Sequence, residues 1–184
     1  MRKSKFWSVL VLTLISCICG FFLAWVFSLA KDKIEENQKK SIKRAVYNLC
    51  PDCERIEEKT IQGKIIYCLY DKKNNLIGYG FCSEGQGYQE KIEVFFVVDK
   101  DIKKLKGIEI IESKETPGLG ARINEGFFKN QFKELDITSS IKCVKHKKSE
   151  KNQIQAITSA TISSKAVVSI VNKGIKKLKT LLGK

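Results

Sequence analysis

The chain opens with a long uncharged segment and continues with a mixture of charged and apolar positions. Between Phe6 and Ala30 there is no charged residue across 25 consecutive positions. As an α-helix rising about 1.5 Å per residue, such a segment reaches ~37 Å, which exceeds the ~30 Å hydrocarbon core of a bilayer. This pattern predicts one membrane-spanning helix within residues 1–30, preceded by a short basic tail.

Beyond the span, the pattern of apolar positions changes twice. Residues 31–60 combine charge with sparse apolar positions, which predicts a helical stalk leading into the folded domain. Residues 61–184 begin with β-rich runs separated by polar turns, and these runs predict two hairpins. The strands are expected at residues 65–70, 76–82, 92–98 and 105–111.

The rest of the domain carries helical signals. Residues 124–132 indicate a short helix capped by Asn124, with three phenylalanines on one side. Residues 142–152 are expected to form a charged loop. From Val167 to Leu182, apolar residues recur at helical spacing and the lysines lie largely off that stripe. Together these elements predict an α+β fold class, with one N-terminal transmembrane helix and a single domain of antiparallel sheet and packed helices.

Charge narrows the classes of function. The chain has 34 basic and 20 acidic residues and a formal net charge of +14. Without residues 1–30 it keeps 31 basic and 20 acidic residues, a net charge of +11. The basic residues are spread through the domain without interleaved aromatic residues, which argues against nucleic-acid binding. The basic C-terminal helix could bind anionic lipid, but we expect it to pack on the core with a solvated lysine face.

The N-terminal segment has two alternative interpretations. A cleaved secretory signal has an apolar run of about 7–15 residues, so the longer run here favours a retained anchor. Residues 14–17 resemble a lipobox, but the uncharged stretch continues well beyond Cys17. Basic residues flank both ends of the span. Because short tails stay inside while long domains translocate largely regardless of charge, we expect a cytoplasmic N-terminus and an extracytoplasmic domain at the cell (inner) membrane.

Seven cysteines leave several chemistries open. Cys50 and Cys53 form a C-x-x-C motif, which is typical of a redox dithiol, half of a zinc site or a local disulfide, and is also compatible with unpaired structural thiols. A four-ligand zinc site has little support, because the sequence has no second C-x-x-C motif and one histidine, His146. We predict neither a metal site nor a catalytic residue.

Two segments have compositions that suggest a functional site and not only a structural role. The first is ETPGLG at residues 115–120, directly after a predicted strand. Pro117 restricts one φ angle, while Gly118 and Gly120 permit backbone conformations that other residues avoid. Such a loop suits either a tight turn into a helix or a flat ligand lying against backbone N–H groups.

The second segment is QAITSATISS at residues 155–164, which leads into the C-terminal helix. Its hydroxyl groups could cap that helix. A helix N-terminus also favours an anion, so a hydroxyl there could bind a phosphate or be esterified to one. Taken alone, the composition of this segment favours capping.

In this order, and behind one N-terminal span, the two segments resemble those of the membrane-anchored FMN-binding domain family. That family includes the G subunit of Rnf electron-transport complexes and the C subunit of sodium-pumping NADH:quinone oxidoreductases. The resemblance covers most of the chain and is weakest over residues 31–64 and 135–152. It implies FMN bound covalently, through a phosphoester, to the threonine that follows Ala160. That threonine is Thr161.

The resemblance also implies a set of residues beside the flavin, namely Glu115, Thr116, Gly118, Leu119, Gly120, Ser159 and Ala160. Family members usually carry aspartate six positions and glycine two positions before the modified threonine. This sequence has Gln155 and Ser159 there. Because a flavin transferase reads the motif, the loss of the aspartate bears on covalent attachment, whereas serine for glycine is a mild change.

The function that the resemblance implies is electron transfer within a membrane-bound, ion-translocating oxidoreductase of Rnf type, from ferredoxin to NAD. The chain would be an electron-carrying subunit and not a complete enzyme, and the single compact domain favours the Rnf type over the quinone-reductase type. Its partners would be the other subunits and a flavin transferase. The alternatives are the C subunit of the sodium-translocating quinone reductase, a free-standing extracytoplasmic flavin carrier, and a non-redox membrane-anchored binding module.

Overall fold

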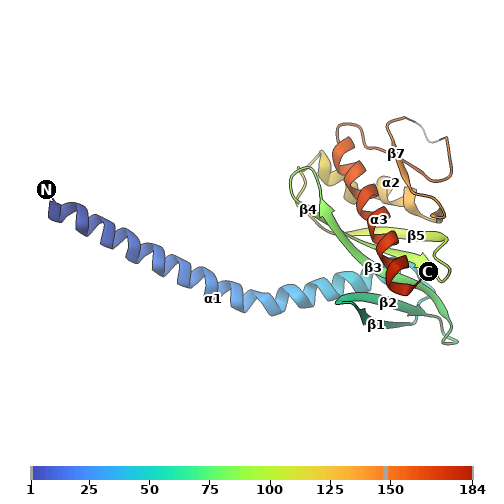
Figure 1. Ribbon diagram of the computed structural model, residues 1–184, viewed down its shortest axis with the longest axis horizontal. Coiled ribbons are helices and arrows are strands. Elements are labelled where there is room, and N and C mark those ends of the chain that lie inside the picture. Colours follow the sequence, from blue (N-terminus) through green and yellow to red (C-terminus); the bar gives the residue numbers. More distant parts are fainter. Residues whose placement is uncertain (1, 147–148, 184) are drawn as a thin grey trace. The chain divides into compact units, whose positions relative to one another are not determined.

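The computed structural model describes residues 2–146 and 149–183. The chain divides into two compact units, Met1–Lys40 and Ser41–Lys184, and helix α1 (Arg2–Leu49) runs through both (Figure 1). Among the described residues, α1 is the one helix long and apolar enough to cross a membrane. The large apolar side chains of its uncharged stretch are exposed, as a span surrounded by lipid requires.

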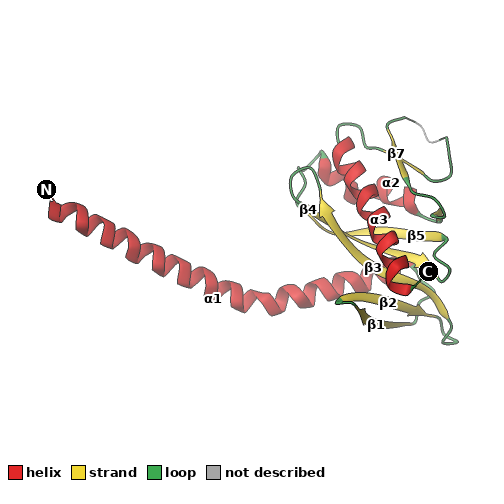
Figure 2. Cartoon of the chain, viewed as in Figure 1, coloured by secondary structure: helices red, strands yellow, loops and turns green. Residues whose placement is uncertain are grey.

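The second unit is built on a six-stranded antiparallel sheet whose strand order follows the chain (Figure 2). The strands are β1 (Arg55–Ile61), β2 (Lys64–Tyr70), β3 (Leu76–Gln86), β4 (Lys91–Asp99), β5 (Lys104–Ser113) and β6 (Leu135–Asp136). The four predicted strands lie within β2 to β5, so the predicted antiparallel sheet is confirmed. β1 was not predicted, because most of its side chains are exposed and it lacks apolar alternation.

The two faces of the sheet are covered by different helices. In β4, Val94 and Phe96 face one layer, whereas Phe95 and Val97 face the other. Helix α3 (Thr161–Leu182) covers the first face (Figure 1), and the last turns of α1 cover part of the second. Because both faces of β4 are buried, its sequence is apolar nearly throughout and does not alternate with polar residues.

The segment between β5 and α3 differs from its prediction. Residues 124–132 do not form one helix, and three short turns follow one another here: η1 (Gly120–Asn124), α2 (Gly126–Lys129) and η2 (Asn130–Phe132). Asn124 caps no helix, since its side-chain amide donates to the carbonyl oxygen of Ala121 at 3.0 Å. Extended backbone at Glu125 separates η1 from α2 and interrupts the helical path.

The three phenylalanines of this segment also do not share one side. Phe128 and Phe132 are fully buried and meet edge to face at 5.5 Å, whereas Phe127 is exposed. A spacing of four places two side chains on one side of a helix, and the position before them turns away. Farther along, the predicted charged loop of residues 142–152 begins with a strand, β7 (Lys142–Val144). It pairs in parallel with β8 (Gln153–Gln155), which directly follows the predicted loop.

Candidate functional site

The two segments singled out in the sequence meet around one pocket of about 370 Å³. The pocket lies where the loop after β5 approaches the first turn of α3. Its lining includes all but one of the predicted site residues: Glu115, Thr116, Leu119, Gly120, Ser159, Ala160 and Thr161. Gly118 belongs to the same loop but is not among the described residues that line the pocket.

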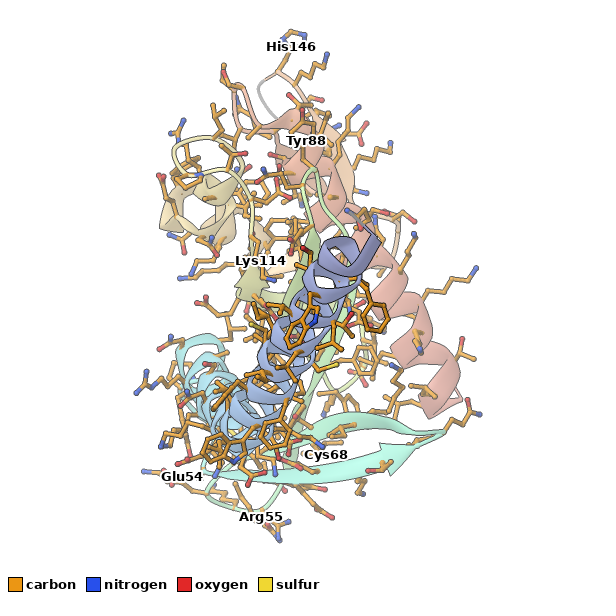
Figure 3. All side chains as sticks on the ribbon, turned by 90° about the vertical axis from the view of Figure 1, so that its left-hand side faces the viewer. Glu54, Arg55, Cys68, Tyr88, Lys114 and His146 are labelled. Carbon is orange, nitrogen blue, oxygen red and sulfur yellow. The ribbon has the colours of Figure 1, made fainter. Side chains whose placement is uncertain are left out.

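Three other lining residues were not predicted: Tyr88, Ile162 and Ser163. Tyr88 lies in the turn between β3 and β4, at the opposite end of the domain from Cys68 (Figure 3). The antiparallel register of β4 and β5, which pairs Ile92 with Ser113, brings this turn beside the start of the loop. Only this strand pairing reveals that Tyr88 lies beside the loop.

The loop at residues 115–120 is a tight turn. The backbone N–H groups of Leu119 and Ala121 both donate to the carbonyl oxygen of Thr116, each at 3.1 Å. Gly118 has φ of 74°, the left-handed region in which glycine is favoured because it lacks a Cβ. The glycine is therefore required by the backbone of the turn, which presents Thr116 and Leu119 to the pocket.

The buried carboxylate of Glu115 connects the segments that form the pocket. Its side chain is only 5% exposed. One carboxylate oxygen accepts from the backbone N–H groups of Tyr88 at 2.7 Å and Gln89 at 3.2 Å, and the other accepts from the Ser163 hydroxyl at 2.7 Å. A single buried carboxylate thus joins the β3–β4 turn, the loop and the first turn of α3. None of these three donors carries a charge.

Two glycines make room for this carboxylate. A Cβ added to Gly87 would collide with Glu115 Oε1, and one added to Gly120 would come within 2.5 Å of Oε2. Each glycine lies on a different segment, one in the turn after β3 and one at the start of η1. The close approach of these segments to Glu115 therefore depends on the missing side chains.

The start of α3 places Thr161 at the pocket. The N-cap position is Ala160, which offers no side-chain cap, so the capping role expected for the hydroxyl cluster is absent at this position. Ser164 supports the preceding turn instead, since its hydroxyl donates to Ala160 O at 2.9 Å and accepts from Ile157 N at 3.0 Å. Among the described residues, the Thr161 hydroxyl has no hydrogen-bond partner. The N–H groups of the first helical turn also lack partners within the helix.

Ser159 lies two residues before Thr161 in a strained conformation. Its φ of 67° is left-handed, a region that L-residues other than glycine, asparagine and aspartate rarely adopt. The backbone at this position directs the chain from the 155–158 segment into α3. A glycine suits this position because it adopts a left-handed φ without strain.

A second hollow of about 440 Å³ is lined by Arg122, Phe127, Gln131 and residues 155–158, the segment that leads to Ser159 of the first pocket. The side chain of Gln131 binds the backbone of this segment at Gln155. Its side-chain oxygen accepts from Gln155 N at 2.8 Å, and its amide donates to Gln155 O at 3.2 Å. The side chain of Gln155 is exposed, so the local fold does not depend on which residue stands there.

Within the described ranges, no group of three or more histidine, cysteine, aspartate or glutamate side chains is placed to hold a metal ion. Arg122 lines the second hollow, pairs with Glu125 at 3.4 Å and lies over the Phe127 ring at 5.1 Å.

Comparison with known proteins places these features in a family context. The family model of the FMN-binding domain matches residues 87–176, a range that contains both segments of the pocket. The G subunit of the proton-translocating ferredoxin:NAD(+) oxidoreductase complex of Clostridium ljungdahlii is 31% identical over 172 residues, covering 94% of this chain and 90% of that protein. The G subunit of the ion-translocating oxidoreductase complex of Methanosarcina acetivorans is 27% identical over 177 residues, covering 91% and 90%.

The fold also has a counterpart among solved structures. The crystal structure of Shewanella oneidensis NqrC aligns with a TM-score of 0.56 at 18% sequence identity. The alignment covers 64% of this chain and 61% of that one, so the chain spans about three fifths of the solved structure. At this identity the likeness concerns the fold, an antiparallel sheet with packed helices.

Proposed function

This chain belongs to the FMN-binding domain family, together with the G subunits of ion-translocating oxidoreductase complexes, and we propose that it carries electrons between the subunits of a ferredoxin:NAD oxidoreductase complex. The observation that carries this proposal is the pocket that unites the ETPGLG loop with Thr161 at the first residue of α3. FMN supplies one- and two-electron transfer when bound, and the protein supplies its position and surroundings.

We place the FMN on Thr161, linked through its phosphate to the side-chain oxygen. Three features of the site suit this linkage. Thr161 lines the pocket, and its hydroxyl has no hydrogen-bond partner among the described residues. The first-turn N–H groups of α3 suit the charge of a phosphodiester, because they have no partners within the helix. The attachment needs a flavin transferase, since the ester has to be made from a nucleotide donor.

The flavin ring would be held by the apolar side chains at the rim of the pocket. Tyr88, Leu119 and Ile162 are 63%, 47% and 57% exposed, although each lines the pocket. Large apolar side chains exposed together around a hollow are suited to a flat aromatic ligand. Glu115 lies behind this surface and positions it, because its carboxylate accepts from the backbone of Tyr88 and from the hydroxyl of Ser163, the residue that follows Ile162.

Gln155 bears on the maturation of the protein and not on its fold. Its side chain is exposed, and the segment is held by contacts to the Gln155 backbone. An aspartate at this position would therefore matter to an enzyme that reads the segment from outside. We infer that the transferase tolerates glutamine here, so that the chain is flavinylated.

The proposed place of the protein is the membrane, with α1 as its anchor. The two relatives described above belong by name to ion-translocating complexes, and α1 has the length and composition of a span. We propose a cytoplasmic N-terminus and an extracytoplasmic FMN domain. In this arrangement the anchor would keep a tethered flavin beside the integral subunits, at high effective concentration.

The test begins with the flavin itself. The full-length protein is produced together with a flavin transferase, denatured and separated on a gel, which is viewed under ultraviolet light. We expect a fluorescent band whose mass exceeds that of the polypeptide by one esterified FMN, and Thr161→Ala should abolish both signals. Thr158→Ala is the matched control, since Thr158 is an exposed threonine of the same segment, and it should stay fluorescent. A dark wild-type band of unmodified mass would overturn the proposal.

Two further measurements separate the alternatives. Mild solubilisation of membranes should recover the flavoprotein with multi-span partner subunits, whereas a free-standing carrier would purify alone. Protease added to sealed, right-side-out vesicles should digest the domain if it is extracytoplasmic. Protection of the domain in those vesicles would reverse the proposed orientation.

A further inference from the structure

The turn that joins α1 to β1 contains a pair of thiols unrelated to the flavin pocket. Cys50 follows the last residue of α1, Cys53 lies two residues before β1, and Pro51 and Asp52 complete the turn. The Cys53 N–H donates to the Cys50 carbonyl oxygen at 3.0 Å. Both cysteines are present as free thiols in this structure.

The backbone of this turn meets the requirement for a bridge. A four-residue turn closed by such a hydrogen bond has its first and last Cα atoms less than about 7 Å apart. Disulfides span Cα separations of roughly 4.4–6.8 Å, so the two ranges overlap almost completely. Pro51 occupies the second position of the turn, where its restricted φ angle favours this shape.

The two side chains also share the same buried surroundings. Cys50 and Cys53 are 1% and 3% exposed and belong to one apolar cluster, with Val46 of α1 and Phe95 of β4. Burial raises the pKa of the Cys53 thiol, and the neighbouring Cys50 sulfur raises it further. Lys106 of β5 reaches the pair as well, since its ammonium donates to Cys50 Sγ at 3.4 Å.

The other thiols of the domain lack this arrangement. Cys68 is buried in β2, Cys82 donates to Glu93 Oε1 at 3.1 Å, and Cys143 lies in β7. Each of these cysteines lies on a different strand, and none shares a turn with another cysteine. A bridge within residues 50–53 is therefore the disulfide that the local backbone favours, and Cys68 and Cys143 serve as internal references.

We propose that Cys50 and Cys53 form a disulfide in the mature protein, which closes the turn between the membrane helix and the sheet. The oxidant is the disulfide of a thiol–disulfide oxidoreductase. The thiolate of one cysteine attacks that disulfide and releases one thiol. The second cysteine then attacks the mixed disulfide and releases the other. Two protein thiols lose two protons and two electrons, and one oxidant disulfide becomes two thiols.

Burial determines when this exchange takes place. The folded thiols are nearly inaccessible, and the protonated form that burial favours at Cys53 is a poor nucleophile. The bridge therefore forms while the turn is still open, as the domain folds. Once closed, the same burial shields it from reductants. Oxidation of this kind belongs to the extracytoplasmic side, so the proposal agrees with the proposed orientation but does not depend on the flavin.

Differential alkylation tests the bridge in the full-length protein. Cells are quenched in acid, the protein is denatured, and free thiols are blocked with one maleimide. After reduction, the released thiols receive a second maleimide of different mass. Trypsin yields a peptide of residues 45–55 that holds both cysteines and no other. We expect this peptide to carry two copies of the second label, and Cys68 and Cys143 to carry the first.

Variants distinguish a true pair from slow labelling. Cys53→Ser should transfer Cys50 to the first label, because its partner is gone, whereas Cys68→Ser should leave the 45–55 peptide unchanged. Reduction of the purified wild-type protein should lower its Tm, and Cys53→Ser should remove that shift. First label on both cysteines of the wild type would overturn the proposal, as would a bridge from either one to another molecule. In-gel flavin fluorescence of the same sample reports the proposed function separately.

Discussion

Glu115 is the residue on which the site depends most. Its carboxylate satisfies two backbone N–H groups and one hydroxyl that lie on three separate segments. Burying a polar group without a partner costs about 1–3 kcal/mol per group, so loss of the carboxylate affects more than a single contact. Glu115 therefore supports the shape of the pocket from a buried position, whereas Tyr88, Leu119 and Ile162 at the rim are exposed.

Glu115→Ala should lower the free energy of unfolding by about 2–4 kcal/mol, because the buried Ser163 hydroxyl and two partly buried backbone N–H groups lose their acceptor together. Urea unfolding of the full-length protein in detergent measures this. Glu90→Ala is the control, since Glu90 forms an exposed ion pair with Lys114 at 3.1 Å and such pairs contribute about 0–1 kcal/mol. Equal effects of the two substitutions would contradict the supporting role of Glu115.

Ser159→Gly should stabilise the protein. The left-handed φ of 67° costs a serine about 1–2 kcal/mol, and part of that gain is offset by the greater freedom of glycine in the unfolded chain. We expect a net increase of ~0.5–1 kcal/mol in the free energy of unfolding, with flavin incorporation retained. Thr158→Gly has no positive φ to relieve and should give no increase. A loss of stability in Ser159→Gly would show that the serine side chain matters more than the backbone.

At the level of elements, the packing of α3 on the sheet positions Thr161. Gly174 lies where the helix packs tightly on the strands, and a Cβ there would come within 2.6 Å of Phe96 and 2.8 Å of Ser83. The Ser83 hydroxyl also donates to the carbonyl oxygen of Ile170 at 3.2 Å. The small residue allows the helix to lie close to β3 and β4, which holds its first turn beside the loop.

Gly174→Ala separates helix propensity from packing. Propensity alone predicts a gain of about 1 kcal/mol, because alanine is the better helix former. Overpacking against Phe96 costs typically about 1–3 kcal/mol, so we expect a net loss of stability and a lower Tm. The exposed neighbour Lys173→Ala should change stability little. A higher Tm for Gly174→Ala would mean that the interface has room to relax.

For the whole molecule, the boundary between anchor and domain can be tested by truncation. A chain of residues 31–184 keeps the part of α1 that is buried against the sheet, including Ile42 and Val46, but loses the uncharged span. We expect full-length protein to remain in membranes after alkaline carbonate washing and the shortened chain to appear in the supernatant with a cooperative thermal transition. Recovery of the shortened chain in the membrane pellet would contradict the assignment of residues 1–30 as the anchor.

The sequence by itself determined those features that are written in contiguous residues. The uncharged run predicted one span, β-rich runs separated by polar turns predicted β2 to β5, and the family resemblance that the two motifs carry implied a common site. Their physical basis is local, because a helix or strand displays its periodicity within a few turns or pleats. The prediction of one short helix capped by Asn124 was wrong. The spacing of the phenylalanines resembles that of a helix, but extended backbone at Glu125 interrupts the helical path.

Only the tertiary structure decided how these segments meet. The place of Tyr88 at the pocket follows from the register of β4 and β5, and the role of Glu115 follows from donors on three segments. The folded backbone also shows why Gly120 has no room for a side chain and why Ser159 is strained. Contacts between residues far apart in the chain leave no periodic trace in the sequence, because they are created by folding itself.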